Sequence, residues 1–168
     1  MVDQHLAIIA LGSNLGDSKK TLQGAMDRLQ ESSPDSMLRS SVWRSSPVDC
    51  PPGSPDFLNA VVAFVPVATE TPESLLQRLQ SLEREFGRGP KTVLNEARPL
   101  DLDLIAFGQL ERNSGELTLP HPRAHQRRFV LQPLSEIAPN FVMPGQTRSV
   151  RQLLELLDTR EALERVTE

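Results

Sequence analysis

Apolar residues in the first half of the chain predict strands and helices in alternation. His5 to Leu11 is an almost continuous apolar run closed by Gly-Ser-Asn, a pattern typical of a buried strand followed by a tight turn. From Ser18, leucine and methionine recur at helical spacing and predict a helix that stops before Pro34. Met37 to Arg44 and Phe57 to Val67 are β-rich, so we expect two further strands on either side of a Pro-rich loop.

The second half of the chain continues this order. Thr71, Pro72 and Glu73 form a helix start, and leucines at helical spacing extend the helix to Gly87. Leu100 to Phe107 alternates with period two and predicts a strand. A hairpin and two short helices are expected before a charged tail, at Gly108 to Thr118, Phe129 to Ile137 and Val150 to Leu157.

The order strand, helix, strand, strand, helix, strand indicates an α+β fold. We expect a ferredoxin-like α/β sandwich, with an antiparallel sheet, helices on one face and a C-terminal extension. The chain has 168 residues, of which 38% are hydrophobic, enough for a single core. Residues 1–168 are therefore predicted to form one domain.

Charge and cysteine content exclude several classes of protein. The net charge of -4 provides no broad basic surface, so we expect no nucleic-acid partner. Cys50 is the single cysteine, which excludes an intramolecular disulfide and fits a reducing compartment. We also find no stretch of about 18 apolar residues and no basic leader, and we expect a cytoplasmic protein without a membrane partner.

Asp101 and Asp103 are the first candidates for chemistry. Residues i and i+2 of a strand point to one face, so the two carboxylates lie side by side while Leu100, Leu102 and Leu104 face the core. Two like charges so close repel unless a cation lies between them, and Mg²⁺ is commonly held by one or two carboxylates with phosphates and water. A solvated strand face is the alternative interpretation of the same pattern.

Several polar residues lie near this pair in the sequence. Arg88 and Arg98 precede it, and His121, between two prolines, is followed by Arg127. Together they offer hydrogen-bond donors to a polyphosphate, although each arginine could instead be a solvated surface residue. Asn59 is an amide within an apolar strand, where a structural hydrogen bond and a contact to a heterocycle are both possible.

Five motifs in order resemble a known enzyme family. They read A-L-G-S-N-L-G-D, F-L-N-A-V-V, L-E-R-E-F-G-R, R-P-L-D-L-D-L-I, and L-P-H-P-R followed by R-R-F-V-L-x-P-L-x-E-I-A-P. This set resembles 6-hydroxymethyl-7,8-dihydropterin pyrophosphokinase of folate biosynthesis over about Ala7 to Pro144. The resemblance implies a ferredoxin-like fold, two Mg²⁺ ions, ATP as donor, and pyrophosphoryl transfer to the hydroxymethyl group of the pterin with release of AMP. It also implies small-molecule partners, and we expect a monomer.

The resemblance implies a role for each residue that matches a motif. Asp101 and Asp103 would be the metal ligands, and with Arg88 and Arg98 would form the catalytic set. The pterin pocket would contain Ser46, Pro47, Val48, Phe57, Asn59 and Phe129. The nucleotide side would contain Glu83, Arg88, Arg98, Thr118, His121 and Arg127.

The chain departs from the family in one loop. Where the family often carries R-W-G-P-R, the aligned stretch is Leu94 to Arg98, which lacks an arginine and a tryptophan, and Pro90 stands where a further arginine is common. These side chains help to close the site over ATP in better-known members. A weakened paralogue that binds ligand without turnover, and a generic ferredoxin-like interaction domain, therefore stay as alternatives.

Overall fold

The computed structural model describes five stretches of the chain. They are residues 5–31, 37–45, 56–87, 99–158 and 162–166. The strands are β1 (Ala7–Ser13), β2 (Leu38–Arg39), β3 (Trp43–Ser45), β4 (Phe57–Phe64), β5 (Asp101–Phe107), β6 (Arg112–Asn113), β7 (Thr118–Leu119) and β8 (Leu163–Arg165). The helices are α1 (Ser18–Glu31), α2 (Pro72–Glu85), α3 (Arg128–Ile137) and α4 (Val150–Leu156), with a short 3₁₀ helix at Ala124–Gln126.

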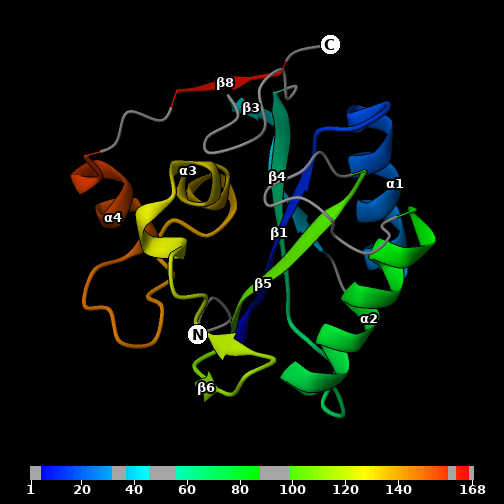
Figure 1. The fold of residues 1–168 in the computed structure, drawn as a ribbon. Coiled ribbons are helices and arrows are strands. Elements are labelled where there is room, and N and C mark those ends of the chain that lie inside the picture. Colours follow the sequence, from blue (N-terminus) through cyan, green and yellow to red (C-terminus); the bar gives the residue numbers. More distant parts are fainter. Residues whose placement is uncertain (1–4, 32–36, 46–55, 88–98, 159–161, 167–168) are drawn as a thin grey trace.

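One sheet organises the molecule. Its strand order is β5-β1-β4-β3-β8, with β2 also paired to β4, and all of these pairs are antiparallel. β1 pairs with β4 on one side and with β5 on the other. β6 and β7 form a separate hairpin after β5 (Figure 1). The predicted α+β fold with an antiparallel sheet is confirmed.

Apolar side chains cover both faces of this sheet. Residues such as Ile9, Val62 and Leu102 pack under α1 and α2, while Ile8 and Val61 pack under α3 and α4. Figure 1 shows these two helix pairs on opposite sides of the sheet. The two helices predicted from Ser18 and from Thr71 lie on one face, as expected, and the C-terminal extension covers the other.

Several boundaries differ from the predicted ones: β4 ends at Phe64 where a strand to Val67 was expected, and β1 runs to Ser13 where it was expected to end at Leu11. The strand expected at Met37 to Arg44 is divided into β2 and β3. The cause is Ser40, whose Oγ accepts a hydrogen bond from the N–H of Val61 at 2.8 Å and so replaces a backbone acceptor of the ladder. The charged tail contributes a strand, β8, which the sequence pattern did not indicate.

Other boundaries follow local chemistry. β4 ends at Phe64, just before Pro66, because proline has no N–H for the ladder. α2 begins at Pro72 behind the N-cap Thr71, whose side chain accepts from the N–H of Ser74 in a capping box. No helix among residues 5–31, 37–45, 56–87, 99–158 and 162–166 is long and apolar enough to cross a membrane.

Gly24 provides a test of packing between the two helices on the first face. It lies inside α1, and a Cβ there would meet Cε1 and Cζ of Phe86 at 3.5 Å, an ordinary van der Waals distance. Because alanine is favoured over glycine inside a helix, we expect Gly24→Ala to raise the free energy of unfolding by about 0.5–1 kcal/mol. Urea denaturation measures this change.

Gly16→Ala is the matched control. Gly16 has a φ of +75°, which an alanine adopts only with strain. The same substitution should there lower the free energy of unfolding by about 1 kcal/mol. A Gly24→Ala protein that is less stable than the unchanged protein would contradict this account of the α1–Phe86 contact.

Candidate active site

One row of residues crosses four strands of the sheet. Trp43 on β3 pairs with Asn59 on β4, and Asn59 pairs with Gly12 on β1. Gly12 in turn pairs with Asp101 on β5. Paired residues of adjacent strands point to the same face, and here it is the face covered by α3. The register therefore brings the predicted amide and the first predicted carboxylate to one surface.

Asp101 and Asp103 lie on this face, at the edge of the sheet. Both are half-buried, whereas Leu100, Leu102 and Leu104 are buried in the core on the opposite side. The alternation predicted for Leu100 to Phe107 is confirmed from Leu100 to Ile105 but breaks after it, since Ile105 and Ala106 both lie in the core under α3, at a register shift of the β1–β5 pair. Asp103 pairs with Ala10, one step along the face from Gly12, so the two carboxylates border a strip of small residues on β1.

Gly12 places no side chain between the amide and the carboxylates. A Cβ at this position would lie 3.7 Å from Asn59 Oδ1 and 3.8 Å from Cδ1 of Phe57. Any side chain on Gly12 would therefore occupy the surface in front of both groups. The sequence indicated only a turn at this glycine, because a strand register cannot be seen in a short motif.

Asn59 is buried and oriented by strand β3. Its Nδ2 group donates to Ser45 Oγ at 2.8 Å and to the carbonyl of Trp43 at 3.4 Å. No hydrogen bond between described residues uses Oδ1, which is the atom turned toward Gly12. The amide thus presents an acceptor to the open surface. Ser45 was not singled out by the sequence, although it directly precedes the predicted pocket residues.

His121, Arg127 and Phe129 come from the segment that leads into α3. The N–H of His121 donates to the carbonyl of Ile105 at 2.8 Å, which ties this segment to β5. His121 Nδ1 accepts from the N–H of Arg123 at 3.2 Å, so a neutral ring carries its proton on Nε2. The guanidinium carbon of Arg127 lies 5.3 Å from the ring centroid of Phe129, a cation–π distance.

The pKa of His121 is lowered from its ordinary value. Burial is the largest cause, and the charges of Arg127 and Arg123 add to it, while the negative charge of Asp101 opposes it. The charges of Arg127 and Asp101 therefore act on the same imidazole. The segment at His121 and the aspartate strand form one electrostatic unit.

Glu83 and Thr118 lie at the margin of this unit. The Glu83 carboxylate, on α2, accepts a hydrogen bond at 2.8 Å from the N–H of Leu102, the residue between the two aspartates. Thr118 is exposed on β7, two residues before Pro120. Glu83 thus contacts the backbone of the aspartate strand, and a nucleotide-binding role for either residue stays a prediction.

Five of the predicted site residues lie outside the described residues. They are Ser46, Pro47, Val48, Arg88 and Arg98. The stretch that departs from the family pattern, Leu94 to Arg98, lies outside them as well.

The carboxylate pair fits a sparsely ligated divalent ion. Among the residues that the structure describes, no group of three or more His, Cys, Asp or Glu side chains could hold a metal by itself. Two carboxylates on one strand face are a suitable donor set for Mg²⁺, which commonly completes its coordination with water and substrate phosphates. Asp101 and Asp103 are the residues that would hold such an ion.

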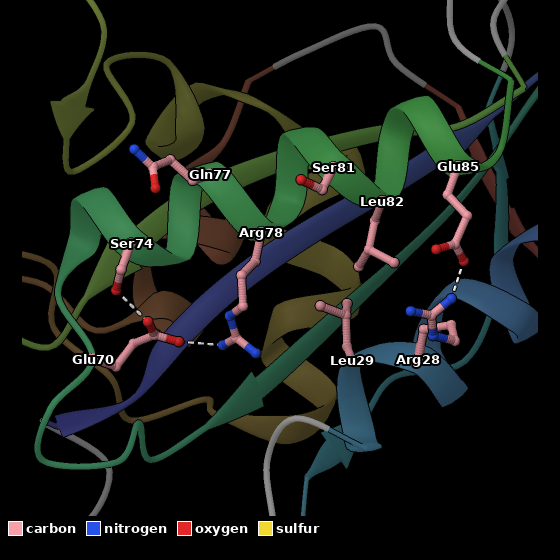
Figure 2. A pocket seen from close by; sticks show the side chains of 9 residues that line it. All are labelled: Arg28, Leu29, Glu70, Ser74, Gln77, Arg78, Ser81, Leu82 and Glu85. Atoms are coloured by element: carbon pink, nitrogen blue, oxygen red, sulfur yellow. Dashed lines mark hydrogen bonds and ion pairs between the residues drawn. The ribbon is translucent and has the colours of Figure 1, made fainter.

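A separate groove lies on the other side of the sheet, between α1 and α2. Its volume is about 460 Å³, and Figure 2 shows its charged side chains paired with each other. Arg28 contacts Glu85, and Arg78 contacts Glu70, which also accepts from Ser74. Neither the aspartate pair nor His121 lines this groove. We therefore assign the candidate site to the face of Asn59 and Asp101.

Comparison with known proteins identifies the family to which the chain is similar. The family model for 7,8-dihydro-6-hydroxymethylpterin-pyrophosphokinase (HPPK) matches residues 8–139. A 2-amino-4-hydroxy-6-hydroxymethyldihydropteridine pyrophosphokinase of Synechocystis is 39% identical, over 92% of this chain and 77% of its own. An enzyme of the same name from Haemophilus influenzae is 37% identical, over 89% of this chain and 93% of its own.

A solved structure supports the fold independently. An HPPK-DHPS in complex with substrates has a TM-score of 0.67 at 12% identity, with 89% of this chain covered. This chain spans 42% of that longer one. With the family model over most of its length and two relatives matched almost throughout, the chain belongs to the 7,8-dihydro-6-hydroxymethylpterin-pyrophosphokinase family of enzymes.

Proposed function

We propose that this chain transfers pyrophosphate from ATP to the hydroxymethyl group of 6-hydroxymethyl-7,8-dihydropterin and releases AMP. The single observation that carries the proposal is the row Asn59, Gly12, Asp101. It holds an amide acceptor and a carboxylate pair on one face, with only a glycine between them. Two inter-strand spacings separate the ends of the row, about 10 Å, which suits a flat ring held between them.

The pterin would bind at the Asn59 end of the row. Asn59 Oδ1 can accept from a ring N–H or the amino group of the pterin, because its Nδ2 is already engaged by Ser45 and Trp43. Phe57 borders Gly12, and Phe129 packs beside the core that lies under α3 and α4. Both therefore offer apolar area to the ring. With the ring there, its hydroxymethyl group would point along the row toward the aspartates.

The nucleotide would bind at the Asp101 end. Asp101 and Asp103 would hold Mg²⁺, and two ions are expected from the family resemblance. When bound, Mg²⁺ neutralises phosphate charge and aligns the reacting oxygens. A neutral His121 donates through Nε2, and Arg127 adds positive charge beside it, so both can bind phosphate oxygens.

The proposed products determine which bonds form and which bonds break. The hydroxymethyl oxygen forms a bond to the β-phosphorus of ATP, while the bond from that phosphorus to the oxygen shared with the α-phosphate breaks. AMP leaves with this oxygen, and the hydroxyl proton is lost to solvent. Such a reaction depends mainly on alignment and charge neutralisation, which this set of residues can provide. The cytoplasmic location and the monomeric state stay predictions.

The test is release of AMP from ATP, Mg²⁺ and hydroxymethyldihydropterin, with Asp101→Ala and Asp103→Ala as variants. We expect either variant to lower turnover by about 100-fold or more, since charge stabilisation of this kind is typically worth that much. Melting temperatures should stay close to that of the unchanged protein, because both aspartates are only half-buried and neither substitution opens a cavity in the core.

Glu116→Ala is the matched control for the aspartate variants. It removes an exposed carboxylate from the hairpin between β6 and β7, and turnover should not change. Absence of AMP above a blank with the unchanged protein would sink the proposal. Tight pterin binding without any turnover would instead favour the alternative of a binding module.

The absence of a side chain at Gly12 gives a second prediction. Gly12→Ala adds a Cβ at ordinary contact distances from Asn59 and Phe57, so the fold should be kept. The methyl group takes up space that the pterin needs, and overpacking of about 1–3 kcal/mol corresponds to a loss of pterin affinity of about 5- to 150-fold. Calorimetry measures that affinity. Gly115→Ala, where nothing lies within 4 Å, serves as the control, and equal affinities in both variants would contradict the prediction.

The lowered pKa of His121 gives a third prediction. In protein without metal or nucleotide, its NMR titration midpoint should lie below the ordinary value of 6.5. A lowered folded-state pKa means that the unfolded chain binds the proton more tightly. The stability present above about pH 6.5 is therefore lost as the pH falls toward the folded-state pKa.

Arg127→Ala tests the cause of this shift. Because the charge of Arg127 lowers the pKa of His121, the variant should titrate at a higher pH than the unchanged protein. A midpoint at or above 6.5 in the unchanged protein would refute the electrostatic description of the site.

A further inference from the structure

Glu136 connects α3 to the strand segment that orients Asn59. Its Oε1 accepts from the indole Nε1 of Trp43 at 2.9 Å and from the N–H of Ser41 at 3.1 Å. Its Oε2 accepts from Ser41 Oγ at 2.8 Å. Three donors from one short segment thus converge on a single carboxylate that is more than 90 residues away in sequence. We call this set the Glu136 clamp.

On the helix side, the clamp is in line with Phe129. Glu136 follows Phe129 by seven residues within α3, which is about two helical turns, so both side chains lie along one side of the helix. Phe129 packs against the core under α3 and α4. Val61 belongs to the same core and is the next residue of β4 on the face that carries Asn59. The side of α3 that carries the aromatic ring is therefore the side that the clamp fastens.

On the strand side, the clamp holds Trp43, one of the two residues that bind the Asn59 amide. The carbonyl of Trp43 and the hydroxyl of Ser45 both accept from Asn59 Nδ2. β3 has only three residues, and its outer neighbour β8 is equally short. Few ladder hydrogen bonds fix the position of this strand, so an additional anchor to a helix has a large share in placing it.

The exposure of the clamp argues against a mainly structural role. Glu136 is exposed and Trp43 is half-buried, so water can replace these hydrogen bonds at small cost in stability. Water cannot, however, reproduce the geometry of these three hydrogen bonds. Three bonds to one carboxylate set the distance between α3 and β3, and with it the distance between Phe129 and Asn59.

We propose that Glu136 is a positioning residue of the pterin pocket. Through Trp43 and Ser41, its carboxylate holds Phe129 and the Asn59 amide at the separation that one pterin ring requires. This inference rests on the pterin-binding role proposed above for Asn59 and Phe129. It assigns to Glu136 no contact with substrate.

Glu136→Ala tests the proposal, and Glu155→Ala is the matched control. Glu155 is an exposed glutamate of the neighbouring helix α4, so the control removes the same charge from the same layer. We expect Glu136→Ala to raise the KM for pterin by about tenfold, the scale of losing hydrogen bonds to a charged group. The KM for ATP, the kcat and the melting temperature should stay near those of the control.

Trp43 provides a spectroscopic measurement of the same contact. It is the only tryptophan of the chain, so the intrinsic emission reports on the residue that Glu136 binds. Glu136→Ala should shift this emission to the red, and Glu155→Ala should not. Titration of pterin followed by this emission gives the affinity directly, without turnover. Glu136→Gln keeps one oxygen acceptor and should recover part of the affinity.

The outcomes separate this inference from the proposed function. If the unchanged protein neither binds pterin nor releases AMP, both proposals fail. If it does both and Glu136→Ala keeps its pterin affinity, only the positioning role fails. Equal rises in the KM for both substrates together with a fall in melting temperature would also overturn it, since they indicate a general structural defect. A glutamine variant that binds more weakly than the alanine variant would contradict it as well.

Discussion

The backbone hydrogen bonds that pair β1 with β4 and β5 determine where the candidate site lies. A shift of one residue in either register would turn Asn59 or the aspartates to the opposite face. Such a shift is prevented by burial, because it would also move Val61 and Val62 of β4, or Leu104 and Ile105 of β5, out of the separate cores on the two faces. Packing on both faces of the sheet therefore fixes the positions of Asn59 and the two aspartates at one end of it.

The two faces contribute in different ways. Under α1 and α2 the sheet is apolar over most of its length, which makes that side a rigid support. Under α3 the apolar residues of β1 and β4 give way to Gly12 and Asn59 at one end. At that end the helix layer supplies Phe129 and the adjoining segment supplies His121. The C-terminal extension thus contributes to the candidate site as well as covering the sheet.

Local patterns in the sequence predicted those structural features that depend on residues close together in the chain. The alternation around Asp101 and the capping signals at Thr71 act within a few residues, and the structure agrees with both. Ser45, β8 and the Glu136 clamp were missed because each is defined by contacts between distant segments. The split of β2 from β3 was missed for a related reason, since Ser40 Oγ bonds to Val61, 21 residues away. The roles of the individual site residues came from a family resemblance and remain open to the experiments above.

The exposed edge of β5 connects the stability of the sheet with the site. An edge strand presents unpaired backbone groups, and here the N–H of Leu102 donates to Glu83 while the carbonyl of Ile105 accepts from the N–H of His121. Two of the proposed nucleotide-side residues thus also complete the hydrogen bonding of the strand that carries both aspartates. A ligand that moved Glu83 or the backbone of His121 would act directly on the spacing of that strand. Loss of activity in a Glu83 variant could therefore arise through the backbone of Leu102 as readily as through lost nucleotide contact, and only affinity measurements for each substrate would separate the two.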